Sequence, residues 1–441
     1  MRSWRWIAAV GISVGAAAWA QDVPSVVGKE LPELVTTYKG LHAAPELSHH
    51  EAKTSALMAE ELRKAGYTVT ERVGKYPDGA QAYGVVGVLK NGAGPTLLIR
   101  ADMDALPVTE ATGLPYASKV RSTNPAGQDV GVMHACGHDI HVTTLIGVAR
   151  AMAELKGQWH GTLMLIGQPS EETIDGAKAM MADKLYERFG KPDMAIALHD
   201  APLPAGLVGV VPGAALASST SIDVVMRGVG SHGSAPEAGK DPIVMAAAFI
   251  TQVQTVVSRS VPPQQPAVVT VGDIHGGTKR NIIPDEVKME LTTRSYNEDV
   301  RQTIITGVER TARGVAIAAG MPEDKMPVVT VLENESTPPM INDVKLSARL
   351  QKTFAARLGA EHMIELKPIM GSEDFGIFGM DGRIPSVIFW LGADDPATFR
   401  ENQKKGVPMP ALHSALFAPV PEPTLQTGIT AMTDAALELL Q

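Results

Sequence analysis

The chain's only cysteine, Cys136, lies in the run His134–His141, which also contains three histidines and an aspartate. A thiolate and an imidazole two positions apart, Cys136 and His138, are ligands that Zn²⁺-like ions prefer. Residues two positions apart do not share a helix face, so we expect this pair on a turn, with Asp139 capping the helix that follows. The alternative is a buried histidine beside an inert thiol, which would leave a polar ring in need of partners.

More candidate ligands lie far along the sequence. Glu171 and Glu172 follow one apolar run, His199 directly closes another, and a further histidine, His413, lies near the end of the chain. Adjacent side chains diverge, which suits one glutamate binding metal and the other activating water. One cysteine, three histidines and one glutamate suffice for two divalent ions. Taken singly, the histidines could be core residues and the glutamates a solvated pair at a helix start.

Two aspartates, Asp102 and Asp104, follow the apolar run over residues 96–99. Residues two apart in a strand face the same way, so either carboxylate could orient a ligand histidine. We predict Asp104 for this role and keep Asp102 as the open alternative.

The elements that would position these residues are apolar runs alternating with helical patterns. Runs over 96–99, 162–166 and 194–198 precede the candidate residues, and helices are predicted over 51–65 and 141–155. Continuous apolar runs are typical of strands buried on both faces, so we expect an α/β fold with a mixed, largely parallel sheet flanked by helices. In such sheets, sites form outside the carboxyl ends of the strands, which is where the candidate residues fall.

From about residue 218 the pattern changes to that of a compact inserted domain. Strand and helix patterns occur in the order β-α-β-β-α-β, over 222–227, 241–259, 267–271, 287–293, 299–319 and 328–332. This order is that of the ferredoxin-like split unit. We therefore predict a catalytic domain over residues 21–216 and 333–441, interrupted by an α+β domain over residues 217–332. A helix over 344–358 belongs to the second part of the catalytic domain.

The first twenty residues resemble a secretory signal peptide. Arg2 and Arg5 precede an apolar stretch, and an Ala-Trp-Ala cleavage site ends at Ala20. We therefore predict export to the periplasm or the medium, with an uncleaved anchor as the alternative. No other segment approaches about 18 apolar residues, so no membrane partner is expected after cleavage. In an oxidising compartment the unpaired Cys136 suits a metal-bound thiolate better than an inert thiol or an intermolecular bridge.

The charge balance narrows the classes of partner. The formal net charge of −9 becomes −11 when Arg2 and Arg5 leave with the signal. An acidic chain argues against nucleic acid and anionic membranes as partners. The 20% charged and 44% hydrophobic residues are ordinary globular values. At this length, more than one core is expected.

Seven short motifs together resemble those of a known family. They occupy residues 100–107, 133–139, 168–172, 197–199, 277–285, 371–375 and 412–414. Their order resembles that of the aminoacylase/carboxypeptidase family of dinuclear metallohydrolases, in the branch of hippurate hydrolases and N-acyl-amino-acid amidohydrolases. The run Met-His-Ala-Cys-Gly-His-Asp at 133–139 is highly specific to that branch. The resemblance covers essentially all of the chain after the predicted signal.

The resemblance implies roles for individual residues and an inserted domain that acts as a lid and dimerisation domain. Two divalent ions would be held by Cys136, His138, Glu172, His199 and His413, one of which bridges them. Glu171 matches the general base and acid, and His232 matches a lid histidine that reaches across a dimer to the substrate carbonyl, as part of an oxyanion hole. Asn281 and Arg294 match lid positions that hold the substrate's carboxylate or carbonyl. The family also implies a homodimer or homotetramer.

The chain departs from the family pattern around the pocket rim. The lid motif at 232–236 reads His-Gly-Ser-Ala-Pro in place of His-Ala-Ala-x-Pro. The run after Glu172 lacks the usual cluster of glycines, and Gly167 stands where an apolar or aromatic residue is expected. These departures bear on the preference for the acyl group rather than on the metal ligands.

The sequence thus predicts an exported, metal-dependent amidohydrolase that cleaves the amide bond of hippurate-like or N-acetyl amino acids, with Glu171 activating water. A metallo-exopeptidase, either carboxypeptidase or dipeptidase, would share every metal residue and is the main alternative. A binding protein without turnover would not need Glu171. A cysteine-nucleophile amidase centred on Cys136 is disfavoured because so many ligands would capture metal. Cysteine and histidine favour Zn²⁺, while Mn²⁺, Co²⁺ and Ni²⁺ also suit mixed nitrogen and oxygen sites.

Overall fold

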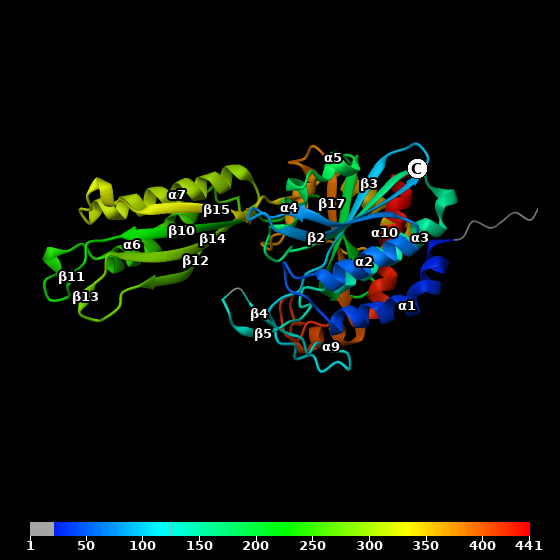
Figure 1. Cartoon of the computed structure of the whole chain (residues 1–441), viewed down its shortest axis with the longest axis horizontal. Coiled ribbons are helices and arrows are strands. Elements are labelled where there is room, and N and C mark those ends of the chain that lie inside the picture. Colours follow the sequence, from blue (N-terminus) through cyan, green and yellow to red (C-terminus); the bar gives the residue numbers. More distant parts are fainter. Residues whose placement is uncertain (1–21, 125) are drawn as a thin grey trace, which may run out of the picture.

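A computed structural model describes residues 22–124 and 126–441, so the predicted signal peptide over residues 1–20 lies outside the described residues. The chain has two parts: a larger α/β part, and a smaller elongated part that projects from it (Figure 1). The smaller part interrupts the larger one in sequence, as the predicted inserted domain does.

A seven-stranded sheet forms the centre of the larger part. Its strands, in spatial order, are β1 (Thr68–Lys75), β2 (Gln81–Asn91), β6 (Gly161–Gln168), β3 (Thr96–Asp102), β7 (Met194–Pro204), β17 (Ser386–Asp394) and β8 (Val208–Gly209). The strands β6, β3, β7 and β17 are parallel, and the other three pair antiparallel at the edges. The predicted mixed, largely parallel sheet is therefore confirmed.

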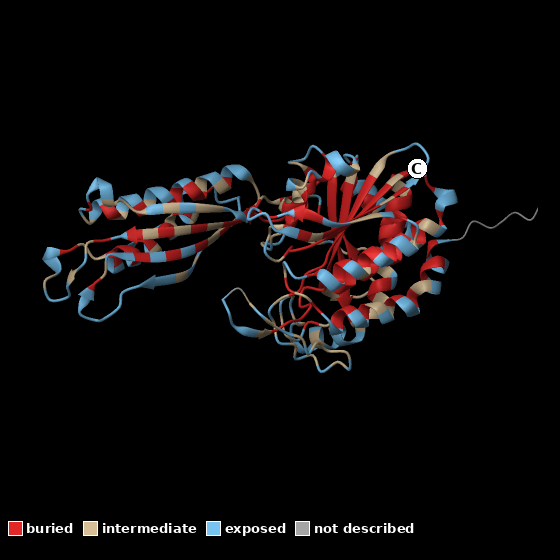
Figure 2. Cartoon of the chain, viewed as in Figure 1, coloured by how far each residue is buried: buried red, intermediate tan, exposed pale blue. Residues whose placement is uncertain are grey.

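Helices cover both faces of this sheet, which explains why its strands are continuously apolar. Leu97 and Ile99 of β3 pack into one core, and Leu98 between them packs into the other. The first core is closed by α1 (Val23–Ala43), α2 (Ala52–Lys64), α3 (His138–Glu154), α8 (Val344–Leu358) and α10 (Pro421–Leu439). The second is closed by α4 (Gly176–Ala182), α5 (Leu185–Phe189) and the 3₁₀ segment Asp374–Gly379. Figure 2 shows the resulting concentration of buried residues in the sheet.

The smaller part, here called the lid, is a four-stranded antiparallel sheet with two helices. Its strands, in spatial order, are β12 (Ala267–Gly276), β14 (Glu286–Ser295), β10 (Ser219–Arg227) and β15 (Val328–Thr337). The helices are α6 (Pro242–Thr255) and α7 (Glu298–Ala318). Chain order and spatial order together are those of the predicted ferredoxin-like unit. Alternate residues of β10, Ile222, Val224 and Met226, point into its apolar core.

Several boundaries of the lid elements differ from the predicted ones. The strand predicted over 222–227 begins at Ser219, and the strand predicted over 267–271 continues to Gly276. The helix predicted over 241–259 is α-helical only to Thr255, and a π-helical turn over Val256–Ser260 ends it. The strand predicted over 328–332 continues to Thr337, with an irregular register opposite Ser219 and Ser221. Local residue patterns do not fix such ends, because packing and backbone hydrogen bonds decide where an element stops.

The remaining elements are short and lie at the margins of the two parts. The two-stranded sheet of β11 (Ser231–His232) and β13 (Ile282–Ile283) forms the end of the lid remote from the central sheet (Figure 1). The strands β9 (Gly213–Leu216) and β16 (Met340–Asn342) pair where the chain passes between the two parts. A hairpin of β4 (Arg121–Thr123) and β5 (Asp129–Gly131), and the helix α9 (Pro396–Lys405), extend the larger part.

Within residues 22–124 and 126–441, no helix combines the length and the apolar character needed to cross a membrane.

Candidate metal centre

The candidate residues meet at the carboxyl edge of the central sheet, as the sequence predicts. Asp102 ends β3, and Glu171 and Glu172 follow the end of β6 by three and four residues. His199 lies within β7, beside the indole of Trp390 on β17, with ring centroids 5.4 Å apart. Parallel neighbours therefore bring three distant segments of sequence to one place.

Cys136 and His138 lie on either side of a tight turn. Gly137 has a φ of +77°, and a Cβ there would lie 2.1 Å from Oδ2 of Asp200, so the position requires glycine. The helix α3 begins at His138, three residues before its predicted start. Asp139 therefore lies inside the first turn, and the prediction that it caps the helix is wrong. Its carboxylate instead pairs with buried His42 at 2.7 Å.

All five predicted ligands converge on one cluster. Sγ of Cys136 lies 3.6 Å from Nε2 of His199 and 3.2 Å from Nε2 of His413. Oε1 of Glu172 lies 3.5 Å from Nε2 of His413 and 3.9 Å from Nε2 of His138. His413 is the most exposed of the five, on a loop whose His413 N–H donates to the Ala135 carbonyl at 2.7 Å.

The cluster divides into two groups of ligand atoms that share Cys136. Cys136, His138 and His199 form one group, and Cys136, Glu172 and His413 form the other, with the ligand atoms in each within 4.8 Å of one another. Nε2 of His138 and Oε1 of Glu172 are buried without a hydrogen-bond partner among the described residues. Thiolate, imidazole and carboxylate donors with free lone pairs would fit two divalent ions.

The outward-facing nitrogens of two ligand histidines are held by backbone carbonyls. Nδ1–H of His138 donates to the carbonyl of Asp104 at 2.8 Å. Nδ1–H of His199 donates to the carbonyl of Asp200 at 2.7 Å. Each bond fixes the tautomer that leaves an Nε2 lone pair facing the cluster, as metal ligation requires.

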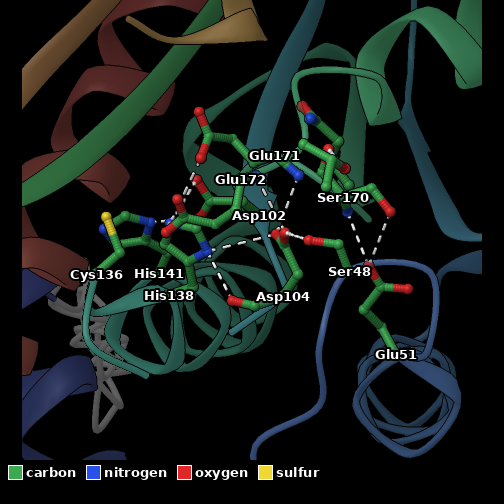
Figure 3. A network of polar contacts seen from close by, with 12 residues as sticks. Ser48, Glu51, Asp102, Asp104, Cys136, His138, His141, Ser170, Glu171 and Glu172 are labelled. Carbon is green, nitrogen blue, oxygen red and sulfur yellow. Dashed lines mark hydrogen bonds and ion pairs between the residues drawn. The ribbon is translucent and has the colours of Figure 1, made fainter. Parts of the chain in front are cut away.

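Asp104 and Asp102 make different contacts although they lie two residues apart. The carboxylate of Asp104 accepts the N–H groups of Glu171 and Glu172 through separate oxygens, each at 3.0 Å (Figure 3). It also accepts the Ser48 hydroxyl at 2.6 Å. The Asp104 carboxylate thus orients the glutamate pair by binding the backbone N–H groups of Glu171 and Glu172. The backbone carbonyl of Asp104 orients His138.

Asp102 belongs to a network that the sequence analysis missed. Its carboxylate pairs with Nδ1 of His141 at 2.5 Å, and Nε2 of His141 pairs with Asp200 at 3.0 Å. Burial opposes protonation of His141, but the charge of Asp102 outweighs it and raises the pKa of His141 to about 9. The spacing of His138 and His141, three apart on one helix, was the available signal for this second histidine.

A buried arginine completes that network from the opposite side. The guanidinium of Arg100 is fully buried and pairs with Asp102 at 2.7 Å and with Glu373 at 2.7 Å. It also pairs with Asp374 at 3.2 Å and donates to Gln168 at 2.8 Å. Glu373 lies 273 residues further along the chain. Residues 371–375 resembled a family motif, but no spacing rule connects them to Arg100.

The two glutamates differ in their electrostatic surroundings. Burial, followed by the negative charges of Glu373 and Glu172, raises the pKa of Glu171 well above its usual range. Burial also raises the pKa of Glu172, to about 7, against the attraction of His138. Carboxylates crowded together out of water favour a compensating cation, which is what a metal site supplies.

The predicted lid residues do not approach this cluster within one chain. His232 and Asn281 are exposed at the remote β11–β13 end of the lid, where the N–H of Gly233 donates to the Asn281 carbonyl at 2.8 Å. Arg294 lies at the other end of β14, half-buried, and donates to Ser219 at 2.8 Å. None of the three touches a predicted metal ligand in the part of the chain that the structure describes.

A cavity of about 610 Å³ opens beside the cluster at Glu172. Its walls include Leu47, Ala105 and Leu106, with the polar His49 and Asn124 among the lining residues. A partly apolar cavity of this size next to reactive carboxylates has the properties of a small-molecule site.

Comparison with known proteins places this geometry among hydrolases. The model of the peptidase family M20/M25/M40 matches residues 98–405. A hippurate hydrolase of Campylobacter jejuni is 37% identical over 77% of this chain and 82% of its own length. An N-acetyldiaminopimelate deacetylase of Limosilactobacillus reuteri is 34% identical over 91% of this chain and 96% of its own length. The crystal structure of a dinuclear metal-binding M20 peptidase from Bacillus subtilis superposes with a TM-score of 0.74 at 27% identity, covering 94% of this chain and 99% of that one.

Proposed function

The chain belongs to the peptidase family M20/M25/M40, hydrolases of amide bonds, and we propose that it cleaves the amide bond of N-acyl amino acids with Glu171 as general base. The observation that supports this most directly is that a sixth side chain, the carboxylate of Glu171, lies beside the five predicted metal ligands. Oε2 of Glu171 lies 3.9 Å from Nε2 of His138, and ligand atoms of Glu171, Glu172 and His138 lie within 4.8 Å of one another. A site built only to hold metal would not need this buried acid.

The residues that would hold two divalent ions are Cys136, His138, Glu172, His199 and His413. When bound, such ions lower the pKa of water and polarise a carbonyl oxygen. Glu171 takes the proton from the attacking water and later returns it to the leaving nitrogen. Burial and the charges of Glu373 and Glu172 raise the pKa of Glu171, which makes its carboxylate a stronger proton acceptor than an ordinary one.

The rest of the site would hold the two halves of the substrate. The cavity beside Glu172 has apolar walls that suit an acyl group. The guanidinium of Arg294 and the amide of Asn281 suit the free carboxylate of the amino acid. His232 would donate to the carbonyl oxygen. Because His232 and Asn281 are both remote from their own chain's cluster, the proposal includes a dimer or tetramer in which a partner supplies both, which analytical ultracentrifugation would test.

A metallo-exopeptidase is the second candidate. A dipeptide presents the same amide and the same free carboxylate as an N-acyl amino acid, and differs by a charged amine on the acyl half. The matching structure from Bacillus subtilis is described as a peptidase. Among the described residues that line the cavity, Glu172 is the only acidic one, so an uncharged acyl group is the better fit.

The proposal also includes export of the chain and Zn²⁺ as the metal. The signal-like residues 1–20 support export. The mass of the chain purified from the exported fraction of cells tests it, because the mature chain should begin at Gln21. Zn²⁺ follows from the cysteine and histidine donors, with Mn²⁺, Co²⁺ and Ni²⁺ as the competitors that metal analysis would distinguish.

The function is tested by release of free amine from N-acetyl, N-benzoyl and dipeptide substrates. Metal-loaded protein is compared with chelated protein, with a Glu171→Gln variant and with Glu187→Gln, an exposed control on α5. Turnover should vanish on chelation, return with added metal, fall at least about thousandfold in Glu171→Gln and stay unchanged in the control. Preference for N-acyl substrates over dipeptides would favour the amidohydrolase.

Two outcomes would count against the proposal. Full activity in Glu171→Gln would remove the base from this residue. Turnover of dipeptides alone would establish the exopeptidase instead.

A further inference from the structure

Three consecutive backbone amides, those of residues 170–172, are held by two buried carboxylates. Glu51 accepts the N–H of Ser170 at 2.8 Å. Asp104 accepts those of Glu171 and Glu172, each at 3.0 Å. Figure 3 shows the two acids approaching the turn from different sides, Asp104 from the end of β3 and Glu51 from the start of α2. The turn that carries the proposed base is therefore fixed by acids from two separate elements.

Glu51 is a buried acid whose side chain does not support the helix that follows it, α2. It directly precedes α2 and makes no side-chain capping bond to it. Its Oε1 accepts the hydroxyl of Ser170 at 3.1 Å and the N–H of His49 at 3.0 Å, in addition to the Ser170 N–H. Its Oε2 has no hydrogen-bond partner among the described residues. All of its polar contacts are therefore directed away from α2, toward the loops that carry His49 and Ser170.

Both residues that donate to Glu51 have left-handed backbone conformations. The φ of Ser170 is +53° and that of His49 is +67°. Neither is glycine, so each is strained and persists only where its surroundings hold it. Ser170 is held further by the Tyr76 hydroxyl at 2.6 Å. Glu51 is the acceptor common to both strained residues, and Ser170 directly precedes Glu171.

We propose that Glu51 is a positioning residue that holds the turn over residues 170–172, and through it the carboxylate of Glu171, in the geometry required for proton transfer. The inference rests on the proposed function, in which Glu171 is the base. Glu51 touches none of the predicted metal ligands, and it meets the cavity lining through the backbone N–H of His49. Displacing a catalytic group by about 1 Å can lower the rate by about a hundredfold, so the expected effect is on kcat.

The chain offers a conservative variant and a matched control. Glu51→Gln keeps an Oε1 acceptor at the same place without charge. It is also a close mimic of the native group near neutrality, because burial and the nearby charge of Asp104 raise the pKa of Glu51 to about 8. Glu46, five residues earlier, accepts the N–H groups of Lys53 and Thr54 at 2.9 Å and so supports the start of α2 without touching the turn. Glu46→Ala therefore reports the cost of disturbing α2 alone.

The test measures three quantities in the metal-loaded protein: kcat and KM for the best substrate, metal content, and hydrogen exchange of the peptide over residues 169–173. In Glu51→Ala we expect kcat to fall about ten- to a hundredfold, with KM within about threefold and metal content unchanged. The peptide should exchange faster. Glu51→Gln should keep at least about half of the native kcat, and Glu46→Ala should change neither kcat nor this exchange.

Other results would overturn the inference. Native kcat in Glu51→Ala, or native exchange of residues 169–173, would show that the turn does not depend on Glu51. Loss of activity in Glu51→Gln as severe as in Glu51→Ala would mean that charge, rather than the acceptor, is required. Failure of the proposed function is a separate result: an active Glu171→Gln would remove the base assignment, whereas the exchange measurement would still decide whether Glu51 holds the turn.

Discussion

The carboxyl edge of the central sheet and the core of the lid are built in opposite ways. At the sheet edge, charged groups such as Glu51, Arg100 and Asp104 are almost fully withdrawn from water. Between residues 219 and 337, no charged side chain is buried among the described residues, and the core is apolar. The lid residues with predicted roles lie on its surface or half-buried at its base. Reactive carboxylates need a desolvated, preorganised setting, whereas a lid needs only a stable shape that carries donors.

This difference has a thermodynamic consequence. A charge taken out of water is stable only while every partner remains, so the sheet edge is sensitive to single substitutions. The lid ion pair of Arg313 and Glu323 has side chains 52% and 73% exposed. Such pairs contribute at most about 1 kcal/mol. The two regions should therefore respond differently to the same kind of change.

The largest expected effect comes from removing one arginine from each region. Arg100→Met leaves Asp102, Glu373 and Asp374 without their buried partner, and should cost about 3–5 kcal/mol of unfolding free energy. Arg313→Met should cost less than about 1 kcal/mol. Urea unfolding followed by circular dichroism measures both. Equal losses of unfolding free energy in the two variants would contradict the proposed difference between the two regions.

A pH-dependent effect of intermediate size should occur in the larger part alone. Burial opposes protonation of His42, but the carboxylates of Asp139 and Glu110 outweigh it and raise its pKa to about 9. Because this pKa is above the unfolded value, His42 stabilises the fold fully below about pH 6.5, and the contribution is lost as the pH rises through about 9. His42→Gln should cost up to about 3 kcal/mol at pH 6 and much less at pH 9.5.

The lid offers a matched control for that experiment. His275 is 76% exposed on β12, so His275→Gln should change stability by less than about 0.5 kcal/mol at both pH values. Thermal unfolding curves at pH 6 and pH 9.5 provide the measurement. A His42→Gln deficit that does not shrink with pH would show that packing, rather than charge, accounts for it.

The smallest effect should be the one that assigns function to the lid. Arg294→Met should raise KM about ten- to a hundredfold, because a charge-assisted bond to the substrate carboxylate is lost, while kcat changes little. Arg310→Met, on the exposed side of α7, should leave both constants unchanged. Steady-state kinetics on an N-acyl amino acid and on its amide, which lacks the carboxylate, provide the measurement. An unchanged KM in Arg294→Met would contradict the assignment.

Much of the fold could be predicted because it depends on local pattern. The helix predicted over 344–358 has those bounds, and the apolar runs over 96–99, 162–166 and 194–198 are all central strands. The start of α3 was misplaced, since Asp139 was interpreted as a cap when its carboxylate instead pairs with His42. A carboxylate near a helix start serves either role equally well in sequence, and only the neighbouring helix decides between them.

The residue types at the site were available from the sequence, but their supporting contacts were not. Cys136, Glu172 and His413 could be proposed as ligands because few other side chains offer such donors in such a context. Glu51 and Arg100 carry no such chemical signature. Their importance depends on which atoms approach them, such as Ser170 for one and Glu373 for the other.

The sequence by itself determined the family, the kind of chemistry and the candidate ligands, because ligand types, apolar periodicity and motif order are properties of the chain. Only the tertiary structure decided that Cys136 is shared by two ligand groups, that Asp104 and Glu51 hold the glutamate turn, and that His232 is remote from its own chain's cluster. These depend on contacts between residues far apart along the chain. Hydrogen bonds and ion pairs act only over a few ångströms, so their partners are known once the fold has brought them together.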